Sequence, residues 1–533
     1  MEETDALEGL TPPIDTKAAR RNSEVDGIHV SLSPSHVSPA QLYSTESGRL
    51  FHAGKICIVL VGLPARGKTH HAVGLTRYLR WLGVKAHAFH LGDYRRKLSG
   101  PEFKVPDDYF MENASPETVE FRRRVIAECM SDVFKFLNDE RGQVAIYDAV
   151  NHTAAIRRRI VKEFQEHNVQ TLFVECLSTD ENIVIRNIRD VKLSSPDYHD
   201  MSFEEAVKHY LRRIELRIPH YETINEPELS YVKLINVSER VIINNAQFGY
   251  LHNRIIFFLM NTRIKIGSIY FARAGQSDYP ESDYKSDAPL SERGHSYAQK
   301  LKQVLYAHLE ERRKKAVQLA TSHSIDKSLL SRVKHRFESA HIKPSESISP
   351  PVDSGTSTPR SPADALAIST IRADTLNERG ANELVVWSST RQRTVETANY
   401  FAKEGIHSVQ KVLLNQLNPG DAGGLSDAEI RTKYASEYDD HKKDPYHHRY
   451  PRAESYHDLA VRMEPLIMEM ERTAGDILII AHESVLRVLY GYLMACSVTE
   501  IPFLRFPRDE IVEIIPNAYV NQTNRIKIPG VDP

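Results

Sequence analysis

The segment Gly62–Thr69, which reads GLPARGKT, constrains the fold more than any other part of the chain. It matches the pattern G-x-x-x-x-G-K-[S/T] and lies between a continuous apolar run, Ile56–Val61, and a segment with helical spacing, Thr69–Trp81. In such a strand–loop–helix unit, backbone N–H groups and the helix N-terminus point at phosphate oxygens. The segment therefore predicts a nucleotide-binding loop within an α/β domain.

The same motif assigns roles to individual side chains. Lys68 would neutralise the β- and γ-phosphates of a nucleotide, and the Thr69 hydroxyl would hold Mg²⁺. A glycine turn that only packs tightly is the alternative. The residues expected to bind ATP here are Gly62, Leu63, Pro64, Ala65, Arg66, Gly67, Lys68, Thr69 and His70.

A second apolar strand, in the segment QVAIYDAVN (residues 143–151), ends in Asp148. An aspartate at the carboxyl end of a strand beside a phosphate loop can bind Mg²⁺ or accept a proton from an attacking hydroxyl. A helix cap or turn residue is the alternative reading of Asp148. Arginine-rich segments at residues 91–96, 120–125 and 211–217 suit a sugar phosphate as a group, although each alone is typical of a solvated helix face.

Strand candidates alternate with helical segments along most of the chain, which indicates parallel α/β sheets. The first series includes Ala86–His90, Val144–Tyr147 and Thr171–Glu175, and the second starts at Ile266. The second series includes Leu384–Trp387 and Asp476–Ile480. We expect a disordered tail over residues 1–50, a P-loop domain over 51–262, and a second domain over 263–533 with a disordered Ser/Pro-rich insertion at about 315–375.

The composition excludes several classes of protein. The chain has 69 Lys and Arg against 71 Asp and Glu, so no global charge favours nucleic acid. No apolar run is long enough to span a bilayer, and the four cysteines have no spacing that suits a metal site or a disulfide framework. We expect a cytoplasmic protein without nucleic-acid or membrane partners.

Several motifs together resemble the bifunctional 6-phosphofructo-2-kinase/fructose-2,6-bisphosphatase family. Besides the phosphate loop they are LGDYRR, VAIYDAVN, NIRDVKLSSPDY, SIYFARAGQS, WSSTRQRTVETA, YPRAESYHDL and IIAHESVLR, in the family's order. The resemblance, to a fungal member in particular, implies a P-loop kinase domain with a parallel sheet, followed by a histidine-phosphatase-like (phosphoglycerate mutase-like) α/β domain. It implies that Mg²⁺ and ATP are used to convert fructose 6-phosphate to fructose 2,6-bisphosphate, a regulator of glycolysis.

Carried over by position, the resemblance assigns further residues of the kinase site. Lys68, Asp148 and Lys192 would be catalytic, and Asn187 and Lys192 would also bind ATP. Fructose 6-phosphate would be bound by Arg95, Arg122, Lys192 and Arg213.

The phosphatase motif departs from the family pattern at its reactive residue. The chain reads Arg273-Ala274-Gly275-Gln276, so Ala274 occupies the position of the histidine nucleophile. The family's general acid falls at Pro419, whereas Arg273, Arg393 and His482 remain. A methyl group cannot replace an imidazole nitrogen as a nucleophile, so we expect fructose-2,6-bisphosphatase activity to be absent.

The kinase domain also departs from the family at Val150, Ile156 and Arg217, all near the expected acceptor pocket. The leading hypothesis is a 6-phosphofructo-2-kinase. The alternatives are a non-catalytic regulator that binds nucleotide or sugar phosphate, and a kinase for another phosphorylated acceptor. A homodimer, and regulation by protein kinases through the tail and insertion, are additional hypotheses.

Overall fold

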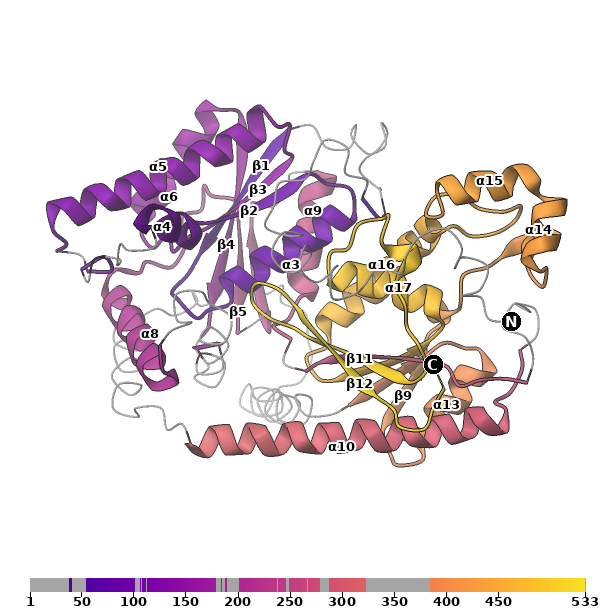
Figure 1. Cartoon of the computed structure of the whole chain (residues 1–533). Helices are drawn as coiled ribbons and strands as arrows, with labels where there is room; N and C mark the ends of the chain where they lie inside the picture. The colour runs from indigo at the N-terminus through magenta and orange to yellow at the C-terminus, as the bar shows by residue number, and fades with distance from the viewer. Residues whose placement is uncertain are drawn as a thin grey trace, which may run out of the picture.

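The computed structural model of the 533-residue chain contains two α/β units, each built on its own six-stranded sheet (Figure 1). It describes residues 38–40, 54–100, 106, 108–111, 113–178, 184, 187–188, 201–236, 238–245, 249–265, 267–278, 287–322 and 384–532.

The sheet of the first unit has the order β2-β3-β1-β4-β5-β6. β1 pairs in parallel with β3 and β4 near the centre, whereas β6 runs antiparallel to β5 at one edge. The strands are β1 (Lys55–Val61), β2 (Ala86–His90), β3 (Val144–Asp148), β4 (Val169–Leu177), β5 (Tyr231–Ile235) and β6 (Arg240–Asn244). The helices are α3 (Lys68–Trp81), α4 (Leu91–Ser99), α5 (Pro116–Asn138), α6 (Ala154–Glu166), α8 (Phe203–Arg217) and α9 (Tyr250–Asn261).

The sheet of the second unit has the order β12-β11-β7-β10-β8-β9. Its β7, β10, β8 and β9 are parallel, and β11 runs antiparallel to both β7 and β12. The strands are β7 (Ile269–Arg273), β8 (Val385–Ser388), β9 (His407–Gln410), β10 (Ile477–Ala481), β11 (Glu510–Ile515) and β12 (Gln522–Lys527). The helices are α10 (Glu292–Ser322), α13 (Gln392–Ala402), α14 (Asp427–Lys433), α15 (Ala435–Lys443), α16 (Tyr456–Arg472) and α17 (Glu483–Leu493).

Local sequence explains where these elements form and begin. The central strand β10 is apolar and buried along its whole length, as expected for a strand covered on both faces. Helix α5 begins after Ser115, whose side chain accepts a hydrogen bond from the Thr118 N–H group. Helix α16 begins with a capping box between Ser455 and Asp458. The two sheets and their helices confirm the two α/β units in the order expected from the sequence.

The structure differs from the expected boundaries at two places. Residues 38–40 lie within the segment expected to be a disordered tail, yet the Ala40 N–H group donates to Trp81 O (3.0 Å) and the Tyr446 hydroxyl donates to Pro39 O (2.9 Å). Helix α10 extends to Ser322, into the expected insertion, because the residues there favour helix. The rest of the tail and insertion lies outside the described residues. No described helix is long and apolar enough to cross a membrane.

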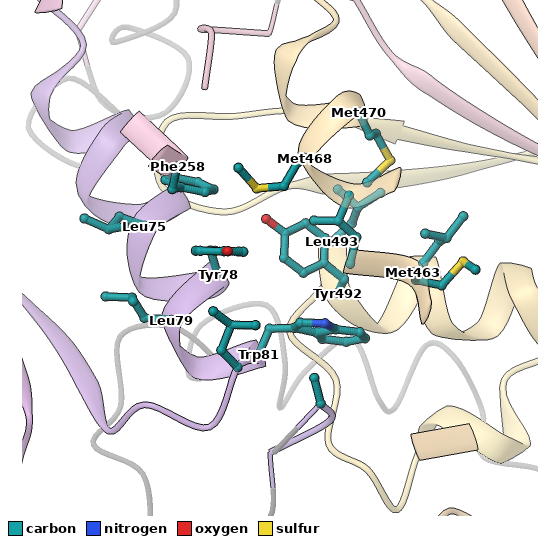
Figure 2. Close-up of a cluster of buried hydrophobic side chains, with 14 of the residues drawn as sticks. Leu75, Tyr78, Leu79, Trp81, Phe258, Met463, Met468, Met470, Tyr492 and Leu493 are labelled. Atoms are coloured by element: carbon teal, nitrogen blue, oxygen red, sulfur yellow. The ribbon is translucent and has the colours of Figure 1, made fainter. Parts of the chain in front are cut away.

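The phosphate-loop helix α3 packs directly against the second unit (Figure 2). Its Trp81 meets the ring of Tyr492 on α17 edge-to-face, with centroids 5.5 Å apart. Arg77 forms an ion pair with Glu471 at 2.6 Å, and Tyr492 donates to the same carboxylate at 2.7 Å. Apolar residues of both units form one buried cluster, and each unit has in addition a buried cluster of its own. The residues labelled in Figure 2 are Leu75, Tyr78, Leu79, Trp81, Phe258, Met463, Met468, Met470, Tyr492 and Leu493.

Candidate active sites

The phosphate loop connects β1 to α3 and is held by residues from distant elements. Gly62 has a φ of 145°, and a Cβ atom there would lie 2.6 Å from Cys176 O, so glycine is required. The Ala65 N–H group donates to the Tyr210 hydroxyl (3.0 Å), and Asn187 Nδ2 donates to Ala65 O (2.9 Å). Asn187, expected to bind ATP, therefore contacts the loop itself.

Lys68 and Thr69 occupy the first turn of α3. Lys68 is buried, and its Nζ donates to Leu63 O at 2.8 Å, so its charged end lies over the loop. Burial lowers the pKa of Lys68, and the negative charge of Asp148 partly opposes this shift. The Thr69 hydroxyl donates to Asp148 Oδ2 at 2.7 Å. The loop and the second strand motif therefore meet at the carboxyl ends of β1 and β3.

A buried histidine completes this group. His90, at the end of β2, places Nδ1 2.8 Å from Asp148 Oδ2. Burial alone would lower the pKa of His90, but the hydrogen bond and charge of Asp148 outweigh it and raise the pKa. Burial would raise the pKa of Asp148, yet the contacts with His90, Lys68 and Thr69 lower it. Asp148 is thus held as a carboxylate.

The expected sugar-phosphate arginines converge around two aromatic rings. The Arg95 guanidinium lies 5.6 Å from the Tyr109 ring centre and 5.5 Å from that of Phe110. Arg122 lies 5.4 Å from the Tyr109 ring, and Arg213 lies 4.1 Å from the Phe110 ring. Three separate helices, α4, α5 and α8, thereby deliver a concentrated positive charge to one place.

Arg217 belongs to the same cluster. Burial, followed by the charge of Arg122, lowers the pKa of the Arg217 guanidinium. Burial and then the charge of Arg217 lower the pKa of His152 to about 4, which places Arg217 near the loop after Asp148 as well. Arg217 therefore adds a cation to the cluster that the other arginines form.

The second candidate site lies at the carboxyl ends of β7, β8 and β10. Arg393 Nη2 lies 2.9 Å from His482 Nδ1, and Ser389 Oγ lies 3.5 Å from His482 Nε2. Burial lowers the pKa of His482 well below its usual value, and the charges of Arg393, Arg391 and Arg273 lower it further. The imidazole is therefore neutral.

Ala274 lies beside this group, directly after β7. Its N–H group donates to Ala481 O (3.1 Å), and Arg508 Nε donates to Ala274 O (3.2 Å). Ala274 is buried, so the backbone of the reactive position is kept in place while the side chain is a methyl group. Pro419, at the expected general-acid position, precedes a short turn and carries no ionisable group.

The second unit also reaches the first site. The loop between β11 and β12 extends towards the first sheet (Figure 1), and its Tyr519 ring lies 6.0 Å from the His90 ring. Burial and then the charge of Asp148 raise the pKa of Tyr519. An aromatic hydroxyl from the C-terminal part of the chain thus lies close to the carboxylate of the nucleotide site.

Comparisons with known proteins agree with both halves of this architecture. The sequence pattern of the family described as 6-phosphofructo-2-kinase matches residues 43–266, and that of the histidine phosphatase superfamily (branch 1) matches residues 371–527. A Saccharomyces cerevisiae protein that bears the provisional name 6-phosphofructo-2-kinase/fructose-2,6-bisphosphatase is 42% identical over 517 residues, covering 96% of this chain and 91% of the relative. The chain belongs to the 6-phosphofructo-2-kinase/fructose-2,6-bisphosphatase family.

More distant relatives also match along most of their length. A fructose-2,6-bisphosphatase of Saccharomyces cerevisiae is 31% identical over 484 residues, covering 90% of each chain. The human 6-phosphofructo-2-kinase/fructose-2,6-bisphosphatase 1 is 30% identical over 469 residues, covering 87% of this chain and 82% of the relative. Membership of the family implies a kinase domain that uses ATP.

Most of the expected site residues meet in the structure, but not all. The loop residues, Asn187 and Asp148 lie together, as do Arg95, Arg122 and Arg213. Lys192, expected to be catalytic, lies outside the described residues, so its role stays a prediction.

Sequence reasoning missed His90, Tyr210 and Tyr519. The position of His90 at the end of a predicted strand was a usable signal, because polar residues at such ends gather at one sheet edge. Nothing in the local sequence marks Tyr210 or Tyr519 as neighbours of the phosphate loop.

Proposed function

We propose that the chain is a 6-phosphofructo-2-kinase that makes fructose 2,6-bisphosphate from ATP and fructose 6-phosphate, and that its bisphosphatase activity is lost. The observation that carries this proposal is the 2.7 Å contact between Thr69 and Asp148, beside a cluster of four arginines. The first feature suits a nucleotide with its metal, and the second suits a phosphorylated sugar.

The residues present fit Mg²⁺ and ATP. The Thr69 hydroxyl and Asp148 carboxylate are the oxygen donors that Mg²⁺ prefers, and bound Mg²⁺ would neutralise phosphate charge. Lys68 and the N–H groups of the loop would hold the β- and γ-phosphates. Asp148, kept ionised by His90, would also orient the attacking hydroxyl and accept its proton.

The acceptor pocket supports a sugar phosphate despite its departures from the family. The family resemblance places a threonine and an arginine at the positions of Val150 and Ile156, and one lost contact to a charged ligand costs about 1.5–3 kcal/mol. Arg217 adds a guanidinium to the cluster of Arg95, Arg122 and Arg213, which offsets part of that loss. Fructose 6-phosphate, with a dianionic phosphate and a 2-hydroxyl, is therefore the proposed acceptor.

The second site supports binding of phosphate without its cleavage. Arg273, Arg393 and neutral His482 remain, but no imidazole at position 274 can attack phosphorus and no acid at position 419 can protonate the leaving oxygen. We therefore assign this site to a phosphorylated metabolite that is held and not hydrolysed. The homodimer, the regulatory phosphorylation and the cytoplasmic location stay predictions.

The test is to incubate the full chain with Mg²⁺-ATP and fructose 6-phosphate and to assay acid-labile fructose 2,6-bisphosphate, with Lys68→Ala as the control. Product that disappears in the variant supports the proposal. ATP binding without product would favour a non-catalytic regulator, and ADP released only with other sugar phosphates would favour a different kinase. Release of phosphate from added fructose 2,6-bisphosphate would contradict the loss of the second activity.

A further inference from the structure

A buried carboxylate lies inside the phosphatase-like site. Glu483 follows His482 directly and is the first residue of α17. Its side chain is 6% exposed, and its Oε2 lies 3.6 Å from Arg273 Nη1. Arg273 is one of the cations that would hold a phosphate in this site, so the protein supplies an anion of its own to the same guanidinium.

The other oxygen of Glu483 is anchored. Oε1 accepts a hydrogen bond from the Phe506 N–H group (3.0 Å) and lies 3.3 Å from Arg487 Nη2. The carboxylate also sits at the N-terminal end of an 11-residue helix, where negative charge is favoured. These contacts hold Oε2 beside Arg273, since the side chain has no freedom to leave without losing several partners.

This arrangement affects any phosphate that enters the site. A phosphate dianion gains from Arg273, but it meets a second negative charge that already interacts with that arginine. Like charges placed together in a buried site oppose each other strongly. The phosphate must either compete with Glu483 for Arg273 or bind with one cation fewer.

We propose that Glu483 is an internal competitor for Arg273 that weakens the binding of phosphate dianions in the phosphatase-like site. The inference rests on the proposed function of this site as a phosphate-binding, non-hydrolysing pocket. It assigns the pocket to small phosphorylated metabolites at high concentration, because ligands present at low concentration would not displace the carboxylate. Glu483 is thus an affinity-determining residue of the site.

The experiment measures the affinity of the full chain for inorganic phosphate by calorimetry at constant ionic strength. All proteins carry Lys68→Ala and Arg213→Ala, which weaken phosphate binding at the phosphate loop and at the arginine cluster of the kinase unit. Glu483→Gln keeps the size and the polar contacts but removes the charge, and we expect it to bind phosphate about tenfold or more tightly. If Glu483→Gln folds but binds phosphate no more tightly than the parent, the proposal is overturned.

Two further variants make the result specific. Glu510→Gln removes a carboxylate that pairs with Arg525 and lies two residues from Arg508, a neighbour of Ala274, and it should leave phosphate affinity unchanged. Glu483→Asp keeps the charge but withdraws it from Arg273, so we expect a smaller gain in phosphate affinity. No gain in this variant would contradict the competition between Glu483 and phosphate. This variant decides the test if Glu483→Gln does not fold. Failure of every protein to bind phosphate, or binding that survives Arg273→Ala, would instead refute the proposed phosphate pocket itself.

Discussion

The two candidate sites of this protein differ in how their chemistry depends on single residues. The kinase site uses a loop backbone, a lysine, a threonine, a carboxylate and several arginines, and the side chains come from five helices and strands, α3, β3, α4, α5 and α8. The phosphatase-like site, in the function we propose, would need a histidine nucleophile at position 274, where the chain has alanine, while Arg393 and His482 keep their contact.

Under the proposed function, the difference shows how an enzyme can lose one reaction and keep its fold. Phosphoryl transfer by a kinase rests on positioning and electrostatics, so the loss of single contacts, as proposed at Val150 and Ile156, would weaken it by increments. Covalent catalysis by histidine has no such gradation, because a methyl group supplies no lone pair. The buried contact between α3 and the second unit also gives the phosphatase-like unit a structural use that needs no catalysis.

The largest expected effect is at Asp148. Asp148→Asn should lower kcat for the formation of fructose 2,6-bisphosphate roughly 100- to 1,000-fold, since it removes the charge that contacts Thr69 and His90. Steady-state rates at saturating substrates would measure this. Asp139→Asn, at the exposed C-terminal end of α5, is the control and should leave the rate unchanged. Equal rates in both variants would show that Asp148 is a cap or turn residue.

The second prediction concerns the contact between the units. Tyr492 is fully buried, faces Trp81 and donates to Glu471, so Tyr492→Ala should cost about 3–5 kcal/mol of unfolding free energy and make the kinase activity more heat-sensitive. Thermal inactivation of the kinase would be compared with that of Tyr490→Ala, which removes a ring on the same helix that faces Phe506 within its own unit. Equal loss of kinase activity in both variants would mean that the contact does not stabilise the kinase unit.

Much of this fold was predictable from the sequence because its strands are continuous apolar runs. The expected Ala86–His90 strand is reproduced residue for residue, and the helix expected over Thr69–Trp81 begins one residue earlier. The phosphate loop was predictable because its tight turn needs glycine at fixed positions, such as Gly62.

Contacts between distant segments could not be predicted in the same way. Tyr519 reaches His90 from a hairpin at the other end of the chain, and Glu483 pairs with Arg273 across two strands' ends. No local period encodes such pairs, since the first depends on how the two units pack and the second on which strands are neighbours in the second sheet. The burial of Ala40 against Trp81 is a contact of the same kind, and the polar sequence around Ala40 gives no sign of it.

The third prediction uses the pH dependence of the His90–Asp148 pair. The pKa of His90 is raised, so the stability that it contributes is fully present below about pH 6.5 and is lost as the pH rises through the raised pKa. The pKa of Asp148 is lowered, so its contribution is present above about pH 4 and is lost as the pH falls through the lowered pKa.

His90→Gln should therefore lower the unfolding free energy by about 2 kcal/mol near pH 6 and by less near pH 9. Urea unfolding of the parent and the variant at a series of pH values would measure the difference in their unfolding free energies. A difference in unfolding free energy that stays constant with pH would show that the His90 imidazole is neutral throughout. Asp148 would then lack the stabilising charge of His90.

The fourth prediction tests whether the second unit contributes to the kinase site. Tyr519→Ala should lower kcat/KM for the kinase reaction about tenfold, because the ring lies 6.0 Å from that of His90 and its hydroxyl lies near the charge of Asp148. Ile515→Ala, a half-exposed residue of the same hairpin, is the matched control. If the two variants behave alike, the hairpin only packs against the kinase unit and the two sites are chemically independent.

The smallest expected effect comes from restoring the missing histidine alone. Ala274→His supplies the nucleophile beside Arg393 and His482, but Pro419 still provides no proton for the leaving oxygen, and general acid catalysis is worth about 10²–10⁴-fold. Phosphate release from fructose 2,6-bisphosphate should therefore stay near background in this variant and rise by that factor only when Pro419→Glu is added. Rapid hydrolysis by Ala274→His alone would mean that another acid, such as Glu454 near Asn418, serves the site. In that case the residue at position 274 alone would decide whether the phosphatase-like site is active. The kinase site, whose chemistry is spread over many residues, would then differ from a site that a single residue switches on or off.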